Sequence, residues 1–508
     1  MNHLSLWCAR LLPFPGSPPR ADSPLPQKAR ALKSANQTFV VVPRAGPAKA
    51  GVSARLRGFG EIQADFMPAA GTAQSGRCAQ CGVPFCQTGC PLENNIPDWL
   101  RLAAEGRAEE AWRQSQATST MPEICGRICP QDRLCEGACT LEQSGWETVT
   151  IGAVERWLGD MAFANGWVDP IRPRRERGLS VGIVGAGPAG LAAADRLRTA
   201  GYAVTVYDRH DRAGGLLTYG IPGFKLEKHV VQRRIDRLID GGVVFRLNTG
   251  IGVDLPFAEV RDAHDAVLIA TGVYQARRLT APGCGSHGVI PALDYLIASN
   301  RKGFGDDVPA FERGELNAAG RRVVVIGGGD TAMDCVRTAV RQGATSVTCL
   351  YRRDRDNMPG SARETLHAEE EGVVFEFLAA PRAVLGGASG VTGVRAQRMA
   401  LSAPGPDGRQ AVEAVPGGEF DLAADLVIEA LGFEPEDIRG LFDEPDLALT
   451  DARTLRTAAR TRATTLPGVF AAGDIVRGAS LVVWAVRDGQ DAAAEIDAWL
   501  SKRVQVAA

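Results

Sequence analysis

The chain has 508 residues, which is enough for roughly three domains of about 100 to 200 residues each. Apolar residues make up 45%, charged residues 23%, and a net charge of -2 gives no general attraction to nucleic acid or to a membrane. The longest uncharged apolar run, at 179–194, is interrupted by four glycines and a proline and is shorter than the ~20 residues a bilayer requires. We therefore predict an α/β protein without a membrane span.

Residues 1–55 are predicted to be an extension of uncertain structure. They are rich in Ala, Pro and Arg, and Asp22 is the only acid before Glu61. Organelle import signals share this composition, whereas the apolar stretch before Arg10 is too short for a secretory signal. We favour a loose extension and a cytoplasmic location over an import signal.

Eight of the 12 cysteines fall between residues 78 and 139, within a region, 56–170, that we predict to be a helical domain. Clustering of this kind in a large chain favours metal binding over disulfides. The spacing reads C-x2-C-x4-C-x3-C-P and then C-x3-C-x5-C-x3-C, without a histidine between them. A fourth cysteine followed by proline is typical of 4Fe-4S proteins, whereas zinc sites use paired knuckles or histidines. We predict two 4Fe-4S clusters on Cys78, Cys81, Cys86, Cys90, Cys125, Cys129, Cys135 and Cys139.

Helical patterns separate and follow the two cysteine groups. Residues 94–116 read as one helix with Asn95 as its N-cap and Pro97 in its first turn, and residues 149–166 read as another. The first helix can fold the two cysteine groups back on each other. A charged segment with two prolines, 170–178, reads as a linker.

A glycine turn follows the linker, between an apolar strand and a helix. Its G-x-G-x-x-G pattern lets backbone amides approach a pyrophosphate at the positive end of the helix. Asp208 ends the next strand, 23 residues after the first glycine, where a carboxylate binds ribose hydroxyls. The turn contains Gly185, Gly187, Pro188, Ala189 and Gly190.

A second copy of this unit begins near residue 321. It has a G-x-G-x-x-A pattern, and its second strand ends in Arg352 and Arg353 where the first copy has an acid. Arginines there can bind a 2'-phosphate through charge-assisted hydrogen bonds, so we predict NADPH at this site. The alternative is a solvated basic loop. The candidate residues of the turn are Gly327, Gly329, Asp330 and Thr331.

Two different dinucleotide sites in one chain suggest a flavin dinucleotide opposite NADPH. Hydride transfer between such cofactors requires positioning and exclusion of water, and we predict no catalytic side chain. The predicted fold is two Rossmann-like domains, the second inserted in the first, after the helical domain. We expect an FAD-binding domain at 178–300 and 430–508 and an NADPH-binding domain at 301–429.

The cysteine block, the two glycine-turn units and the segment 470–485 together resemble the small (beta) subunit of bacterial NADPH-dependent glutamate synthases. The likeness runs from about Leu56 to the last helix. It is more distant to dihydropyrimidine dehydrogenase and to NADPH-ferredoxin transhydrogenases. The resemblance implies FAD, NADPH and two 4Fe-4S clusters. It also implies a hetero-oligomer with a large (alpha) subunit that carries FMN and makes glutamate from glutamine and 2-oxoglutarate.

The resemblance also implies a crossed ligand set, which takes cysteines from both groups for one cluster. One cluster would be bound by Cys78, Cys81, Cys86 and Cys139, and the other by Cys90, Cys129, Cys135 and Glu155. The simpler alternative gives the last four cysteines, Cys125 included, a cluster of their own. By the same resemblance Lys225 lies near the flavin or at the surface. The further residues implied along FAD are Gly214, Gly215, Leu216, Thr271, Gly272, Gly473 and Asp474.

Two other functions fit parts of the pattern. The electron acceptor could be ferredoxin or a pyrimidine-reducing partner instead of a glutamate-forming subunit. A zinc-stabilised interaction scaffold is a more remote alternative.

Overall fold

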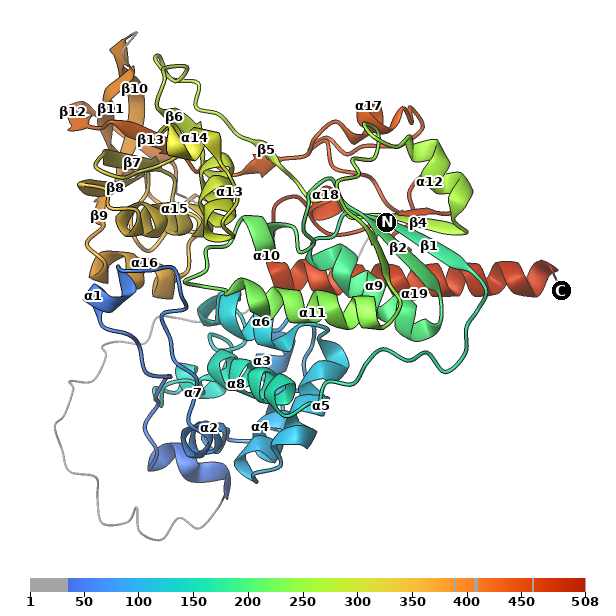
Figure 1. Ribbon diagram of the computed structural model, residues 1–508. Helices are drawn as coiled ribbons and strands as arrows, with labels where there is room; N and C mark the ends of the chain where they lie inside the picture. Colours follow the sequence, from blue (N-terminus) through green and yellow to red (C-terminus); the bar gives the residue numbers. More distant parts are fainter. Residues whose placement is uncertain (1–34, 388–389, 406–409, 459–460, 508) are drawn as a thin grey trace.

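The computed structural model describes residues 35–387, 390–405, 410–458 and 461–507. A helical domain lies against two α/β domains, and both α/β domains contact it (Figure 1). No helix in these ranges has the length and apolar character needed to cross a membrane. Cys8 and the rest of 1–34 lie outside the described residues.

The helical domain is held together by an apolar core that includes the buried side chains of Trp99 and Trp112. The single helix predicted at 94–116 is two helices, because the chain turns at Gly106 with φ of +77°. The helices are η2 (Ala35–Val40), α1 (Val52–Arg55), α2 (Pro68–Ser75), α3 (Phe85–Thr88), α4 (Ile96–Ala104), α5 (Ala108–Thr118), α6 (Pro122–Ile128), η3 (Gln131–Arg133), α7 (Thr140–Gln143) and α8 (Ile151–Ala164).

The first α/β domain is built on a five-stranded parallel sheet with the order β15-β4-β1-β2-β3. Its edge strand β15 comes from near the end of the chain, so the domain is interrupted in sequence. The strands are β1 (Ser180–Val184), β2 (Ala203–Tyr207), β3 (Val244–Arg246), β4 (Ala266–Ile269) and β15 (Val469–Ala471). The helices are α9 (Pro188–Ala200), α10 (Leu216–Tyr219), α11 (Lys228–Asp240), α12 (Phe257–Ala263), α17 (Ile438–Phe442), α18 (Asp474–Arg477) and α19 (Val482–Ala507).

The second α/β domain has a parallel sheet with the order β6-β13-β7-β8-β9 and lies within the interruption of the first. The predicted insertion is therefore present. The expected start at residue 301 differs from the structure, because β6 already pairs with β13. The strands are β6 (Val289–Pro291), β7 (Arg322–Ile326), β8 (Ser346–Tyr351), β9 (Val374–Phe377) and β13 (Leu426–Glu429). The helices are α13 (Ala292–Gly303), α14 (Pro309–Glu312), α15 (Asp330–Arg341) and α16 (Ala362–Glu370).

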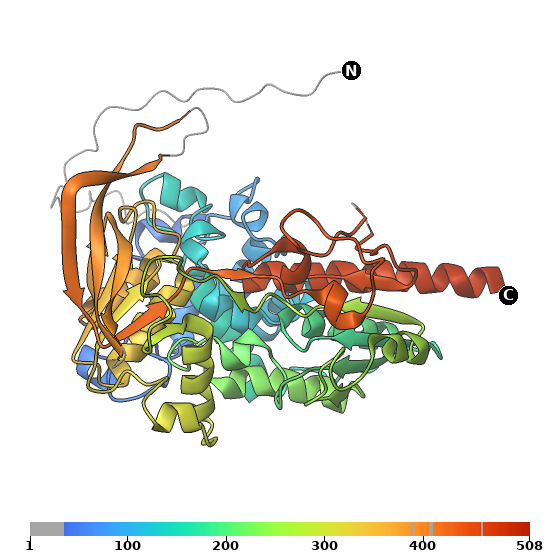
Figure 2. The ribbon, with the colours of Figure 1, turned by 90° about the horizontal axis from the view of Figure 1, so that it is seen from above.

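A second, antiparallel sheet covers the insertion on its outer side, which the sequence analysis did not predict (Figure 2). Its inner residues Val394 and Ala396 pack in one core with Val324 and Val427 of the parallel sheet. Its strands are β10 (Ala379–Gly387), β11 (Gly390–Leu401) and β12 (Val412–Ala423). The short strands β5 (Gln275–Ala276) and β14 (Phe433–Glu434) pair where the chain passes between the two domains.

The long helix α19 connects the first α/β domain to the helical domain. It lies along α9 so closely that a Cβ on Gly489 would be 2.1 Å from the carbonyl oxygen of Ala189. Its first turns lie over the helical domain, and its end extends away from the body of the protein (Figure 2).

Candidate functional site

The first glycine turn requires glycine at two positions. Gly185 has φ of +111°, and a Cβ there would lie 2.4 Å from the carbonyl oxygen of Ala270. A Cβ on Gly190 would lie 2.0 Å from the carbonyl oxygen of Gly185, so α9 can approach the turn only with glycine at this point. Gly187 is the N-cap of α9, and no heavy atom lies within 4 Å of a Cβ placed on it. The turn thus leaves open space in front of a helix N-terminus, as a pyrophosphate site requires.

A cleft follows this turn along the carboxyl ends of β1, β2 and β4. It has two parts, of about 650 and 1000 Å³, which share Gly185, Asp208, Thr271 and Tyr274. Most of the residues predicted to bind the first nucleotide therefore lie together. Those that line the cleft are Gly185, Gly187, Pro188, Ala189, Asp208, Leu216, Thr271, Gly272 and Asp474.

The remaining predicted glycines shape the cleft from behind. Gly214 donates its N–H to the carbonyl of Ala186 at 2.8 Å. A Cβ on Gly215 would lie 2.8 Å from the Cα of Gly187, and one on Gly473 would lie 2.9 Å from the Cβ of Ala189. These glycines allow two separate segments, at 214–215 and at 473, to pack around one turn.

Asp208 is buried at the end of β2 and accepts hydrogen bonds from the backbone N–H of Ala186 at 2.8 Å and of His210 at 2.9 Å. The carboxylate thus links the end of the strand to the glycine turn. Arg209 lies next to it, with its guanidinium 4.7 Å from the ring centroid of Tyr274.

Arg209, His210 and Tyr274 line the cleft and were not predicted. Arg209 and His210 directly follow the acid that ends β2, so their place in the chain was the available signal. The hydroxyl of Thr271 is buried without a hydrogen-bond partner among the described residues. A ligand rich in oxygen and nitrogen acceptors, such as FAD, fits this cleft.

The second glycine turn has the same backbone form. Gly327 has φ of +146°, and a Cβ there would lie 2.3 Å from the carbonyl oxygen of Ala430. Gly329 is the N-cap of α15 and faces open space. Asp330 accepts a hydrogen bond from the N–H of Ser361 at 2.9 Å, and Thr331 follows it in the first turn of the helix.

Arg352 and Arg353 follow β8 directly, beside this turn. Arg352 is exposed and Arg353 is half-buried, and no described carboxylate forms an ion pair with either. The Nε atom of Arg353 is buried without a hydrogen-bond partner in the described part of the chain. Two cations without an anionic partner beside a dinucleotide turn fit a 2'-phosphate.

Cys139, from the second cysteine group of the sequence, lies close to cysteines of the first group. Burial raises the pKa of the Cys78 thiol to about 11, and the nearby thiols of Cys139 and Cys81 act in the same direction. Burial likewise raises the pKa of Cys86 to about 12, again with Cys78 and Cys139 as neighbours. Cys81 Sγ lies 3.6 Å from the hydroxyl of Thr140, the residue after Cys139. Cys139 therefore lies with Cys78, Cys81 and Cys86.

The other four cysteines and Glu155 surround one small cavity. Cys90, Cys125, Cys129 and Cys135 line it together with the Glu155 side chain. Burial raises the pKa of Glu155 to about 8. Asn94 Nδ2 at 3.0 Å and Ser115 Oγ at 3.3 Å donate hydrogen bonds to its Oε1 atom.

Among the described residues, no three His, Cys, Asp or Glu side chains are arranged to hold one metal ion. A 4Fe-4S cluster binds each cysteine at a different iron, so its ligands need not converge on one point. Thiolates are the ligands that such clusters use, and the two groups of buried thiols fit them.

The first turn of α19 lies between the second cysteine group and the cleft at Asp208. At the start of α19, Leu481 and Val482 line the cleft, whereas Val483 lines the cavity that contains Cys90. Arg487 donates a hydrogen bond to the carbonyl of Pro91 at 3.0 Å and fixes α19 against this group. The cleft and the cysteine group are therefore direct neighbours.

Lys225 has a different place from either of those expected. It does not line the cleft at Asp208, and it is not at the surface: its side chain is 9% exposed, and its Nζ lies 2.8 Å from Asp334 of α15. It thus joins the two α/β domains.

Two family models match the chain. Residues 55–167 match the model described as dihydropyrimidine dehydrogenase domain II, 4Fe-4S cluster, and residues 179–489 match the model of the pyridine nucleotide-disulphide oxidoreductases. These matches confirm the predicted iron-sulfur domain in front of a nucleotide-binding oxidoreductase, with FAD, NADPH and 4Fe-4S as the cofactor classes.

Solved structures give a fold likeness. The FprA protein of Mycobacterium tuberculosis, in a structure described as a complex with NADPH, matches with a TM-score of 0.56 and 22% identity. The match covers 66% of this chain and 86% of that one, and at this identity it shows the fold alone.

Curated relatives match over almost their whole length. The glutamate synthase (NADPH) small chain of Azospirillum brasilense is 59% identical over 92% of this chain and 97% of the relative. The protein of the same name from Escherichia coli is 45% identical over 91% of this chain and 98% of the relative. The chain therefore belongs to the family of NADPH-dependent glutamate synthase small chains.

Proposed function

We propose that the chain is the electron-input subunit of an NADPH-dependent glutamate synthase and that it works in the cytoplasm with a large subunit carrying FMN. Bound FAD supplies hydride acceptance from NADPH, and 4Fe-4S clusters supply one-electron transfer. The observation that supports this most is the single turn of α19 between the flavin cleft and the cavity at Cys90. All 11 described cysteines are free, which agrees with a reducing compartment.

We assign one nucleotide to each glycine turn from the residues that follow β2 and β8. The cleft at Asp208 and Thr271 would hold FAD, with its pyrophosphate at the N-terminus of α9. The turn before α15 would hold NADPH, with its 2'-phosphate at Arg352 and Arg353. These residues bind and orient cofactors, and none is needed as an acid, base or nucleophile.

We favour the crossed ligand set for the clusters. The neighbourhood of Cys139 with Cys78 and Cys86 supports it, and so does the presence of Glu155 in the cavity of Cys90. In this scheme Cys125 lines the cavity without binding iron.

The ligand scheme is tested by iron content. Cys125→Ala should keep all of the iron, whereas Cys129→Ala and Glu155→Ala should lose about half of it, because one of two clusters is lost. Loss of half the iron in Cys125→Ala, with none lost in Glu155→Ala, would contradict the crossed scheme.

We propose that the large subunit binds where the first cysteine group approaches the surface. Val83 and Phe85, which lie between Cys81 and Cys86 in the chain, are 63% and 50% exposed. Exposed apolar side chains of this kind are common at protein interfaces. The residues around the cavity of the second group, in contrast, are mostly buried.

The function is tested by mixing the purified holoprotein with the large subunit. Glutamine plus 2-oxoglutarate should then start NADPH oxidation, and Phe85→Ser should weaken assembly. Ile239→Ser is the matched control, because Ile239 on α11 is also 50% exposed. If a correctly assembled complex shows no stimulation, the acceptor is another one, such as ferredoxin or a pyrimidine-reducing partner.

A further inference from the structure

Residues 48–64 form a loop that is closed at its base. Ala64 donates its N–H to the carbonyl of Ala48 at 2.8 Å, and Ala50 donates to Ile62 at 2.9 Å. Its tip carries α1 and lies beside α16 of the second α/β domain (Figure 1). We call residues 48–64 the strap. Its first part falls in the region that composition indicated to be a loose extension.

The tip of the strap binds the second α/β domain through buried charges. Arg55 is 5% exposed, and its Nη2 and Nη1 atoms lie 2.8 Å from Glu370 and 3.3 Å from Glu371. Lys49, at the base of the strap, adds an ion pair with Glu370 at 2.7 Å, but both of these side chains are about one-third exposed. Arg55 is therefore the buried link between the strap and the end of α16.

The other end of the strap binds the two remaining domains at once. The Glu61 carboxylate accepts hydrogen bonds from Arg127 Nε of the helical domain at 2.7 Å and from the N–H of Glu227 of the first α/β domain at 3.1 Å. Arg156 of α8 lies 3.0 Å from the same carboxylate. One buried acid thus joins the strap to both domains.

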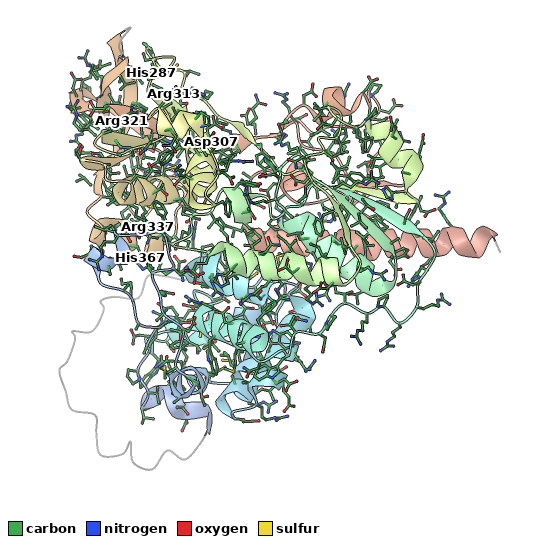
Figure 3. The ribbon with its side chains drawn as sticks, viewed as in Figure 1. His287, Asp307, Arg313, Arg321, Arg337 and His367 are labelled. Atoms are coloured by element: carbon green, nitrogen blue, oxygen red, sulfur yellow. The ribbon has the colours of Figure 1, made fainter. Side chains whose placement is uncertain are left out.

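The two α/β domains also meet directly beside the strap. The ring of Phe224, from the first domain, lies under the guanidinium groups of Arg337 and Arg341 of α15, at 4.4 and 4.0 Å. Both arginines bind Glu371, the residue that Arg55 reaches from the other side. Figure 3 shows Arg337 and His367 at the side of the second domain that faces α1.

We propose that the strap fixes the NADPH-binding domain against the FAD-binding domain, and that Arg55 is a positioning residue for hydride transfer. The proposal rests on the assignment of the two nucleotides given above. Hydride transfer needs the two reacting rings in contact, and a misplacement of about 1 Å can slow a reaction by about 100-fold. The buried ion pairs of Arg55 with Glu370 and Glu371 would have to break if the second α/β domain rotated away from the strap, so they hold this domain in place.

Arg55 offers a clean test because its removal leaves the second domain with its own charges paired. Glu371 keeps Arg337 Nε at 2.9 Å and Arg341 Nη1 at 2.6 Å. Arg55 does not line the cleft at Asp208, and its side-chain hydrogen bonds go to Glu370 and Glu371 at the end of α16, not to the turn at Gly329. A variant at this position should therefore retain its cofactors and lose the link between domains.

The experiment measures flavin reduction by NADPH in the anaerobic holoprotein, with flavin content, iron content and the Kd of NADP+ measured on the same samples. In Arg55→Gln the rate should fall about 10- to 100-fold while the Kd stays unchanged. Arg55→Lys, which keeps the charge, should restore part of the rate. Lys49→Gln is the control and should be close to wild type, because exposed ion pairs contribute little.

If Arg55→Gln has full cofactor content and reduces its flavin at the wild-type rate, the proposal is overturned. It is also overturned if the variant only binds NADP+ more weakly and its flavin is reduced at the wild-type rate once the nucleotide is saturating. If Arg55→Gln does not fold, Glu370→Gln replaces it, since Arg55 then keeps Glu371. Glu370→Gln should slow reduction by a smaller factor, and an unchanged rate would contradict the proposal. Failure of the wild-type protein to reduce its flavin with NADPH would instead contradict the proposed function.

Discussion

The helices that follow the two glycine turns, α9 and α15, have 13 and 12 residues and differ in how many charged side chains they bury: one in α9, Asp195, and three in α15. α9 buries a run of small residues, including Ala192 and Ala193, against the sheet and α19. α15 buries three charged residues, Asp334, Arg337 and Arg341, which bind the neighbouring domain and α16. The same strand–turn–helix unit can thus contribute to a domain core or to a domain interface, depending on which side chains its helix carries.

The strands β2 and β8, which follow α9 and α15, also end in different charged residues. The first ends in the buried Asp208, which is bonded to the glycine turn, and the second ends in Arg352 and Arg353, which have no described anionic partner. In the proposed assignment the backbone provides a pyrophosphate site twice, and these few side chains select the nucleotide.

The largest effect is expected at the glycine that packs α9 on its turn. In Gly190→Ala the new Cβ would lie 2.0 Å from the carbonyl oxygen of Gly185, so the helix must move away from the cleft. We expect a protein that loses its flavin on gel filtration, measured as flavin absorbance per chain. The equivalent residue of α15 is Ala332, and Ala332→Gly should keep NADPH binding and lose only about 1 kcal/mol of stability. Full flavin content in Gly190→Ala would contradict this account of the turn.

The next effect concerns the choice of nicotinamide nucleotide. The double variant Arg352→Gln/Arg353→Gln should raise the KM for NADPH about 100-fold or more, since each hydrogen bond to a charged group contributes about 1.5–3 kcal/mol. The KM for NADH should change little. Steady-state kinetics with both nucleotides and an artificial acceptor measure the difference, and equal weakening of the two would rule out the 2'-phosphate contact.

Lys225 and Lys228, three residues apart, have different environments, and this difference makes the stability of the protein depend on pH. Lys225 is paired with Asp334 of α15, whereas Lys228 donates hydrogen bonds to the carbonyls of Leu217 and Ile221. Burial lowers the pKa of Lys228 to about 7. Between pH 7 and about 10 the unfolded chain therefore binds a proton here that the folded chain does not.

Stability should for this reason rise with pH in that interval, by up to about 1.4 kcal/mol per pH unit from this group. Urea unfolding of wild type and Lys228→Met at pH 7 and pH 9 measures the contribution, and the variant should lose that part of the slope. Lys225→Met should keep it. An identical slope in wild type and Lys228→Met would show that the Lys228 ammonium is not suppressed by burial.

The smallest effect is expected at the acid of the first unit. Asp208→Asn keeps the size of the side chain but places an amide near the N–H of Ala186, which now donates to the carboxylate at 2.8 Å. Flavin affinity, measured by fluorescence titration of the flavin-free protein, should weaken about tenfold. An unchanged affinity would mean that the acid serves neither the turn nor the ribose.

The sequence was most informative where a local pattern determines the structure. The two glycine turns, the strand ends at Asp208 and Arg352, and the helix at 149–166 depend on neighbouring residues and could be predicted. The break at Gly106 was missed because glycine is also tolerated inside helices.

The parts that could not be predicted depend on contacts between distant segments. Arg55 reaches Glu371 across 316 residues, and Lys225 reaches Asp334 across 109. A basic residue in a region of Ala, Pro and Arg gives no signal of such a partner. The approach of Cys139 to Cys78 is also of this kind, although the resemblance implied it.

We propose that the chain holds FAD at the first turn and NADPH at the second, with the two reacting rings in contact. The decisive measurement is anaerobic mixing of the purified holoprotein with about one equivalent of NADPH, followed at the flavin absorbance band. We predict rapid loss of the flavin absorbance with NADPH and a much slower loss with NADH. A flavin that stays oxidised with NADPH, in a protein with full flavin and iron content, would contradict this arrangement of the two nucleotides.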